Sequence, residues 1–145
     1  MHYEGLFYKK SPLLLCTAIA GHMNNFDSMP AINKKTMIAK TPLPPYYAVI
    51  FTSIKTVNYD GYEKMAIRMA ELAQQQPGYL GMESAREETG ITISYWESLE
   101  AIRHWKNNSE HLIAQETGKA QWYEAYKTRI CLVERDYGFE KEEHS

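Results

Sequence analysis

The stretch YLGMESAREETGITISYW, residues 79–96, lies at the centre of the pattern that decides the fold. It contains two extended segments, and the polar sequence EETG separates them. Gly90 ends this polar sequence, and a glycine can adopt the positive φ that a hairpin turn requires. The stretch therefore predicts an antiparallel pair of strands with its turn at Gly90.

A helix and a strand are predicted on the amino-terminal side of this pair. In residues 58–78 the apolar side chains recur at steps of three and four until Pro77-Gly78 ends the pattern, and they are Tyr62, Met65, Ala66, Met69, Leu72 and Ala73. This spacing predicts an amphipathic helix. The preceding sequence YYAVIFTSIKT, residues 46–56, is rich in aromatic and β-branched residues without a helical period, which predicts a strand.

A helix in two pieces and a last strand are predicted on the carboxyl-terminal side. Ser98 can cap the first piece, and residues 107–109 interrupt it. Ser109 can cap the second piece, which Gly118 divides from the sequence KAQWYEAY. The sequence KTRICLVERDY, residues 127–137, alternates in the manner of a strand.

The resulting order is strand, helix, strand, strand, helix, strand. It predicts the α+β class and a ferredoxin-like βαββαβ unit, in which both helices cover one face of a four-stranded antiparallel sheet. Both sides of the first and last predicted strands carry apolar residues, so the uncovered face would expose apolar surface. We therefore expect two copies to pair sheet to sheet as a homodimer that forms a dimeric α+β barrel.

The 145 residues divide into an extended or poorly ordered segment 1–45, a domain 46–139 and an acidic tail 140–145. The run SPLLLCTAIAG in the first 28 residues loosely imitates a signal peptide, but it contains Pro12 and is too short to span a bilayer. An upstream extension of the reading frame is the alternative, because Met29 and Met37 both precede the periodic part. We expect a cytoplasmic protein.

Composition and motifs exclude several classes of function. The net charge is −2 and the basic residues are scattered, so neither nucleic acid nor a membrane surface is an expected partner. Cys16 and Cys131 lie too far apart to indicate a disulfide framework, which favours a reducing compartment. The five histidines show no metal-binding spacing, and the glycine-rich motifs that bind phosphate groups are absent. The sequence therefore predicts no protein-bound metal and no nucleotide site.

The segments QQPGYLGMES and ISYWESLEAIRHWKNNSEH, with the closing aromatic strand, resemble the antibiotic biosynthesis monooxygenase family. The resemblance covers residues 46–139. The family consists of small dimeric α+β barrels and also includes haem-degrading monooxygenases. Members that act on polycyclic phenols use molecular oxygen without a flavin or a metal, because the substrate itself becomes an electron-rich anion. The resemblance thus implies a cofactor-independent monooxygenase of a quinol or aromatic substrate.

The haem-degrading branch is the alternative that the resemblance implies. That branch has an Asn on its first strand, a Trp on its helix and, ten residues after the Trp, a His that binds iron. Trp105 matches the Trp, but Thr52 and Ser53 stand where the Asn would be and Gln115 stands where the His would be. An amide is a poor axial ligand, so haem binding would have to use His111 instead. A dimer that only binds a small molecule is the third interpretation.

The candidate site residues lie mainly between the third and fourth predicted strands. The candidates for chemistry are Trp105, His111 and Gln115, and the candidates for pocket lining are Phe51, Tyr95, Trp96 and Trp122. His111 and Gln115 are four residues apart and would project from one side of a helix. Trp105 also fits an apolar core stripe, and Trp122 also fits a dimer contact. Tyr95 and Trp96 must point to opposite faces of the sheet, so at most one faces the helices. His104 is expected at the surface.

Overall fold

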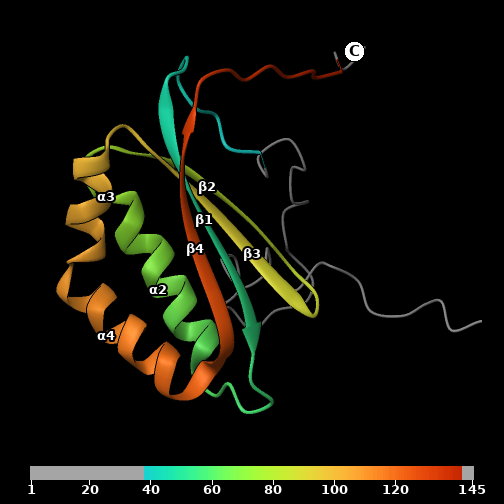
Figure 1. Ribbon diagram of the computed structural model, residues 1–145, viewed down its shortest axis with the longest axis vertical. Helices are drawn as coiled ribbons and strands as arrows, with labels where there is room; N and C mark the ends of the chain where they lie inside the picture. The colour runs from blue at the N-terminus through green and yellow to red at the C-terminus, as the bar shows by residue number, and fades with distance from the viewer. Residues whose placement is uncertain (1–37, 142–145) are drawn as a thin grey trace, which may run out of the picture.

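The computed structural model describes residues 38–141, and the signal-peptide-like run and both candidate start residues lie outside them. The elements in chain order are β1 (Tyr46–Lys55), α2 (Tyr62–Gln74), β2 (Tyr79–Arg86), β3 (Thr89–Trp96), α3 (Leu99–Lys106), α4 (Ser109–Thr117), the π-helical turn η2 (Gly118–Trp122) and β4 (Tyr123–Val133). The four strands form one antiparallel sheet in the order β2-β3-β1-β4. The helices lie on one side of this sheet (Figure 1). The predicted ferredoxin-like α+β fold is confirmed.

Helix α2 forms where the apolar period predicted it. The chain turns into the helix at Gly61, whose φ of 79° lies in the left-handed region that glycine adopts without strain. The buried residues of the helix are Tyr62, Ala70, Leu72 and Ala73, which are spaced to share one face. Helix α3 begins at the predicted cap, because Ser98 Oγ accepts a hydrogen bond from the Ala101 backbone N–H at 3.1 Å.

The main core lies under α3. Trp96 at the end of β3 is fully buried and packs with Ala101 and Ile102 of α3. Tyr79 of β2 meets the Trp96 ring edge to face, with ring centroids 5.5 Å apart. Because this core lies at one end of the sheet, the helix layer is held tightly there, and the centre of the sheet is left to line a cavity.

The hairpin turn differs from its prediction. Strand β2 ends at Arg86 and β3 begins at Thr89, so Gly90 lies within a strand and not in the turn. The glycines with positive φ among the described residues are Gly61, Gly78 and Gly81. A Cβ at Gly90 would overlap the guanidinium of Arg86, so the glycine leaves room for the Arg86 side chain to lie across the strand.

Two boundaries in the carboxyl-terminal half also differ. The cap of α4 is Asn108 and not Ser109, because Asn108 Oδ1 accepts hydrogen bonds from the backbone N–H groups of Glu110 and His111 at 3.1 and 3.2 Å. Strand β4 begins at Tyr123, four residues before the predicted start. The π-helical turn η2 accounts for this, since it ends the helical path at Trp122 and releases the next residues into the sheet.

The other face of the sheet, which we call the outer face, carries apolar residues. They include Ala48 and Ile50 of β1 and Ile91 and Ile93 of β3, which alternate with the residues that face the helices. Ile91 is 42% exposed. Residues 38–45, which we call the lead-in to β1, cover part of this face. There the Ala39 backbone N–H donates a hydrogen bond to Glu83 Oε1 at 2.9 Å. No helix among the described residues has the length and apolar character needed to cross a membrane.

Candidate functional site

A cavity of about 630 Å³ lies between the sheet and the helix layer. Its floor comes from the helix-facing residues of all four strands, including Val49, Phe51, Met82, Ser94 and Ile130. Helix α2 forms one wall with Met65 and Met69. The lining residues Tyr126 and Ile130 of β4 are 44% and 53% exposed, so the cavity meets solvent along the β4 edge. A mainly apolar cavity of this size is typical of small-molecule sites.

An aromatic stack closes the cavity at the α3 end. The Trp105 indole lies over the fully buried Trp96, with ring centroids 6.3 Å apart and an interplanar angle of 24°. The His111 imidazole lies on Trp105, with centroids 4.2 Å apart and an angle of 9°. Trp105 and His111 line the cavity, whereas Trp96 supports the stack from beneath.

The hydrogen bonds of His111 fix the position of its proton. Its Nδ1 lies 2.9 Å from the Trp105 carbonyl oxygen, which can only accept, so Nδ1 carries the hydrogen and donates it. The other ring nitrogen, Nε2, is therefore an acceptor. Burial lowers the pKa of His111 below its usual 6.5, and the hydrogen bond to Trp105 opposes this only in part. The ring is consequently neutral at pH 7, with a lone pair available at Nε2.

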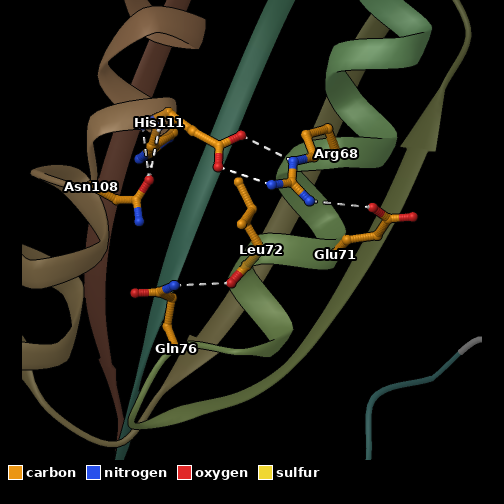
Figure 2. A network of polar contacts seen from close by, with 7 residues as sticks. Arg68, Glu71, Leu72, Gln76, Asn108 and His111 are labelled. Atoms are coloured by element: carbon orange, nitrogen blue, oxygen red, sulfur yellow. Dashed lines mark hydrogen bonds and ion pairs between the residues drawn. The ribbon is translucent and has the colours of Figure 1, made fainter.

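The break between α3 and α4 brings His111 back onto Trp105. Asn108 Oδ1 accepts from the backbone N–H of His111 and so caps α4 (Figure 2), and only two residues separate the end of α3 at Lys106 from the start of α4 at Ser109. Helix α4 is tied to α2 by Arg68, which donates from Nε and Nη2 to the two carboxylate oxygens of Glu110 at 3.0 and 2.9 Å. The sequence predicted the interruption, and its consequence is the stacking of two residues six positions apart.

Gln115 also lines the cavity, one turn after His111. Its amide nitrogen donates to the Lys106 carbonyl oxygen at 2.9 Å, which fixes the orientation of the amide. The Gln115 Nε2 and the His111 Nδ1 lie 3.4 Å apart, and each donates to a carbonyl. The side-chain oxygen of Gln115 thus remains an acceptor. The two residues share one side of α4, as their spacing predicted.

These residues do not match the ligand set of a haem-degrading enzyme. Gln115 stands at the iron-ligand position and is held by Lys106, and an amide does not replace imidazole at iron. Ser53, near the position of the strand Asn, accepts a hydrogen bond from Arg86 instead. Within residues 38–141 the structure contains no group of three or more His, Cys, Asp or Glu residues that could hold a metal ion.

The remaining predicted pocket residues fall in three places. Phe51 lies on the cavity floor, and Trp122 lines the end of the cavity farthest from α3, where its indole N–H donates to the Asp60 carbonyl oxygen at 2.9 Å. Trp96 is buried behind Trp105. Tyr95 does not line the cavity, because the alternation of β3 directs it to the outer face, where its hydroxyl donates to Glu83 at 3.2 Å.

Sequence reasoning missed the polar residues near Trp122. Tyr62 and Tyr123 line the cavity there with their rings edge to face, 5.9 Å between centroids. Burial raises the pKa of the Tyr123 phenol, with further contributions from Tyr62, so Tyr123 stays protonated. Arg86 donates to Tyr62 Oη at 3.3 Å. The available signal was Arg86 at a helix-facing position of a strand, where an unpaired charge is rare.

Comparison with known proteins supports one family. A family model described as antibiotic biosynthesis monooxygenase matches residues 45–117. The uncharacterized protein YqjZ of Bacillus subtilis (strain 168) is 51% identical over 106 residues, which cover 72% of this chain and 93% of that protein.

Solved structures share the fold. SnoaB from Streptomyces nogalater, described as a cofactor-independent oxygenase, gives a TM-score of 0.53 at 15% identity and covers 68% of this chain and 100% of its own. PA3566 from Pseudomonas aeruginosa gives 0.55 at 14% identity, with 66% and 99% covered. These low identities support the fold alone. The family match over half of the chain is the stronger finding, and the protein belongs to the antibiotic biosynthesis monooxygenase family.

Proposed function

We propose that this protein is a cofactor-independent monooxygenase that oxidises a quinol or related hydroxyaromatic substrate with molecular oxygen. The observation that carries the proposal is the pairing of an apolar cavity with a neutral imidazole whose Nε2 is an acceptor. Family membership and the fold shared with SnoaB support it. A cavity of about 630 Å³ accommodates a substrate of several rings.

The reaction needs no external reductant. Loss of a hydroxyl proton gives an aromatic anion that can pass an electron to O₂, and recombination of the resulting pair forms a carbon–oxygen bond. Loss of water from the hydroperoxide then leaves a quinone. For a phenol with a free ring position, one O₂ gives one quinone and one water, and the substrate supplies all four electrons. The protein has to bind the ring, remove the proton and exclude bulk water.

His111 is the base in this scheme. Its Nε2 accepts the hydroxyl proton, while its Nδ1–H stays on the Trp105 carbonyl and stabilises the charged ring. Trp105, which is stacked between Trp96 and His111, contributes its ring edge to the cavity wall, and the Gln115 side-chain oxygen accepts from a second hydroxyl. Phe51 and Trp122 supply apolar lining.

The assembly we propose is a cytoplasmic homodimer that pairs through the outer face. Ile50 and Ile93 lie there with the partly exposed Ile91, and a second copy would remove this apolar surface from water. The substrate cavity lies on the opposite side of each sheet. In this dimer the cavity of each protomer therefore stays open to solvent along β4.

Oxygen uptake with a panel of dihydroxyarenes and anthrones tests the function. We expect uptake by the protein as purified, unchanged by a metal chelator. The substitution His111→Gln keeps a side chain that can donate to the Trp105 carbonyl but removes the base, so turnover should fall by about 10²-fold or more. His104→Gln is the matched control, since His104 is 69% exposed and should leave turnover unchanged.

Two outcomes favour the alternatives. If panel compounds bind to the folded protein but none consumes oxygen, the protein is a small-molecule-binding module. Haem binding through His111 is favoured only by the acceptor state of Nε2. Titration with hemin checks this alternative. We expect either no Soret shift in the wild type or a shift that is the same in His111→Ala. A shift lost in that variant would support haem binding and contradict the cofactor-independent scheme.

A further inference from the structure

A cationic cluster lies at the end of the cavity opposite His111. Arg86 extends across Gly90 on the helix-facing side of the sheet and donates from Nη2 to Ser53 Oγ at 2.7 Å and to Tyr62 Oη at 3.3 Å. Lys55 Nζ lies 4.5 Å from the centroid of the Tyr62 ring, and the Arg86 guanidinium carbon lies 5.5 Å from it. Two cations therefore contact one tyrosine that lines the cavity.

The charge of this cluster is not balanced by an ion pair among residues 38–141. The Arg86 Nε and Nη1 atoms are buried and have no hydrogen-bond partner in that part of the chain. The salt bridges found there involve neither Arg86 nor Lys55. Burial lowers the pKa of Lys55, the charge of Arg86 lowers it further, and only exposed Glu63 opposes them. Buried guanidinium nitrogens without a hydrogen-bond partner or a carboxylate are costly, and an anion bound nearby would offset this cost.

Tyr62 connects this positive charge to the cavity, because its hydroxyl contacts Arg86 and its side chain lines the cavity. Its hydroxyl oxygen accepts from Arg86, so its own proton is available to a third group. The neighbouring Tyr123 remains protonated and lines the same end. The site thus offers phenolic donors backed by positive charge, an arrangement suited to an oxygen that carries negative charge.

The two ends of the cavity are separated along β3. Trp96 and Gly90 of β3 mark the two ends and are six residues apart, which corresponds to about 20 Å between their backbone positions. The side chains that line the cavity extend across part of this distance. A conjugated ring system can lose a proton at one end and carry much of the resulting charge on an oxygen at the other. Such a ligand would meet a base at His111 and donors at Tyr62.

We propose that the Tyr62 hydroxyl binds an anionic oxygen of the substrate, and that Arg86 positions this hydroxyl and stabilises the anion. The inference rests on the proposed function and names the form of the substrate that the cavity recognises, an aromatic phenolate or enolate. Tyr62 contacts the ligand. Arg86 is a positioning residue, because it acts through Tyr62.

The ionisation of a bound dye tests the inference without turnover. Alizarin and 4-nitrocatechol change colour when they lose a proton, so anaerobic absorbance titration gives their pKa free and bound. We expect binding to lower the dye pKa by about 1–3 units in the wild type. Tyr62→Phe and Arg86→Met should each lose most of this shift, and Arg86→Lys should retain part of it. Arg103→Met removes an exposed charge from α3 and should retain all of it.

Circular dichroism checks that each variant is folded. If Arg86→Met does not fold, Tyr62→Phe still tests the inference, because it removes the hydroxyl and keeps the aromatic ring. A bound dye with an unshifted pKa, or a shift equal in the wild type and in Tyr62→Phe, overturns the inference while oxygen uptake can still support the proposed function. A lowered dye pKa without oxygen uptake supports the anion site and contradicts the oxygenase. If no dye binds, the inference is overturned, and oxygen uptake alone decides the proposed function.

Discussion

The residues at the two ends of the cavity differ in how far the sequence predicted them. Trp105, His111 and Gln115 were found because helical spacing and the family resemblance both concern neighbours along the chain. Arg86 and Tyr62 meet only because β2 pairs with β3 in a register that sets Arg86 beside Gly90. Spacing along one element does not contain that information. The interpretation of Gly90 as a turn residue was wrong for the same reason.

His111 should make stability depend on pH. Burial lowers its pKa in the folded state, so the unfolded chain binds the proton more tightly and the free energy of unfolding falls as the pH drops below about 6.5. Each unit of lowering corresponds to about 1.4 kcal/mol. Urea unfolding between about pH 8 and pH 5 checks this. The decline should be shallower in His111→Gln and unchanged in His104→Gln. An equal decline in all three proteins would assign the effect to other groups.

Gly90→Ala should separate stability from ligand recognition. The added Cβ displaces the end of a flexible side chain, so the Arg86 guanidinium leaves Ser53 and Tyr62 while the sheet remains. The expected loss is about 1 kcal/mol of unfolding free energy, the size of the hydrogen bonds given up. The dye pKa should nevertheless return to the level found for Arg86→Met. A shift that survives in Gly90→Ala would show that the guanidinium acts from another position.

Helix α4 is the least buried of the helices that enclose the cavity. It has no fully buried residue, and it is held by the Asn108 cap and by the pair between Arg68 and Glu110. The sequence predicted a divided helix, but the caps and the π-helical turn at Gly118 depend on backbone geometry that residue type does not determine. Such a loosely packed helix is expected to open locally more readily than the sheet.

Removing the pair should therefore loosen α4 alone. In Arg68→Gln we expect faster hydrogen exchange at the α4 amides, with the thermal midpoint almost unchanged, because both partners are nearly half exposed. Glu116→Gln, an exposed change on the same helix, is the control. High salt should reduce the difference between wild type and Arg68→Gln. Equal exchange in both variants would mean that packing and not the ion pair holds the helix.

At the scale of the whole molecule, the sequence predicted the arrangement of helices and strands and the apolar face of the sheet that the helices leave uncovered. The order of elements and the alternation of strands are sufficient for a ferredoxin-like sheet with one uncovered face, because each element follows from local periodicity. The coverage of part of that face by the lead-in was not predictable, since it depends on the contact of Ala39 with Glu83, which are far apart in the chain. The remaining apolar surface belongs to β1 and β3.

A charge on this surface should break the proposed dimer. Ile91→Lys on the outer face is expected to shift the protein from dimer to monomer in light scattering coupled to size exclusion, because a buried lysine without a partner is costly. Ile113→Lys on α4 is the control, since Ile113 is 59% exposed and lies away from the outer face. A dimeric Ile91→Lys protein or a monomeric wild type would rule out pairing through this surface.

The positions of the tryptophans give the protein an optical reporter at each end of its cavity. Trp105 lies in the stack with His111, and Trp122 is held by its hydrogen bond to Asp60 beside Tyr62. Fluorescence from variants that retain the indoles of only one end, either Trp96 with Trp105 or Trp122 alone, would register a bound chromophore by the quenching it causes. The ratio of quenching at the two positions would then give the direction in which an asymmetric ligand lies, without any added label.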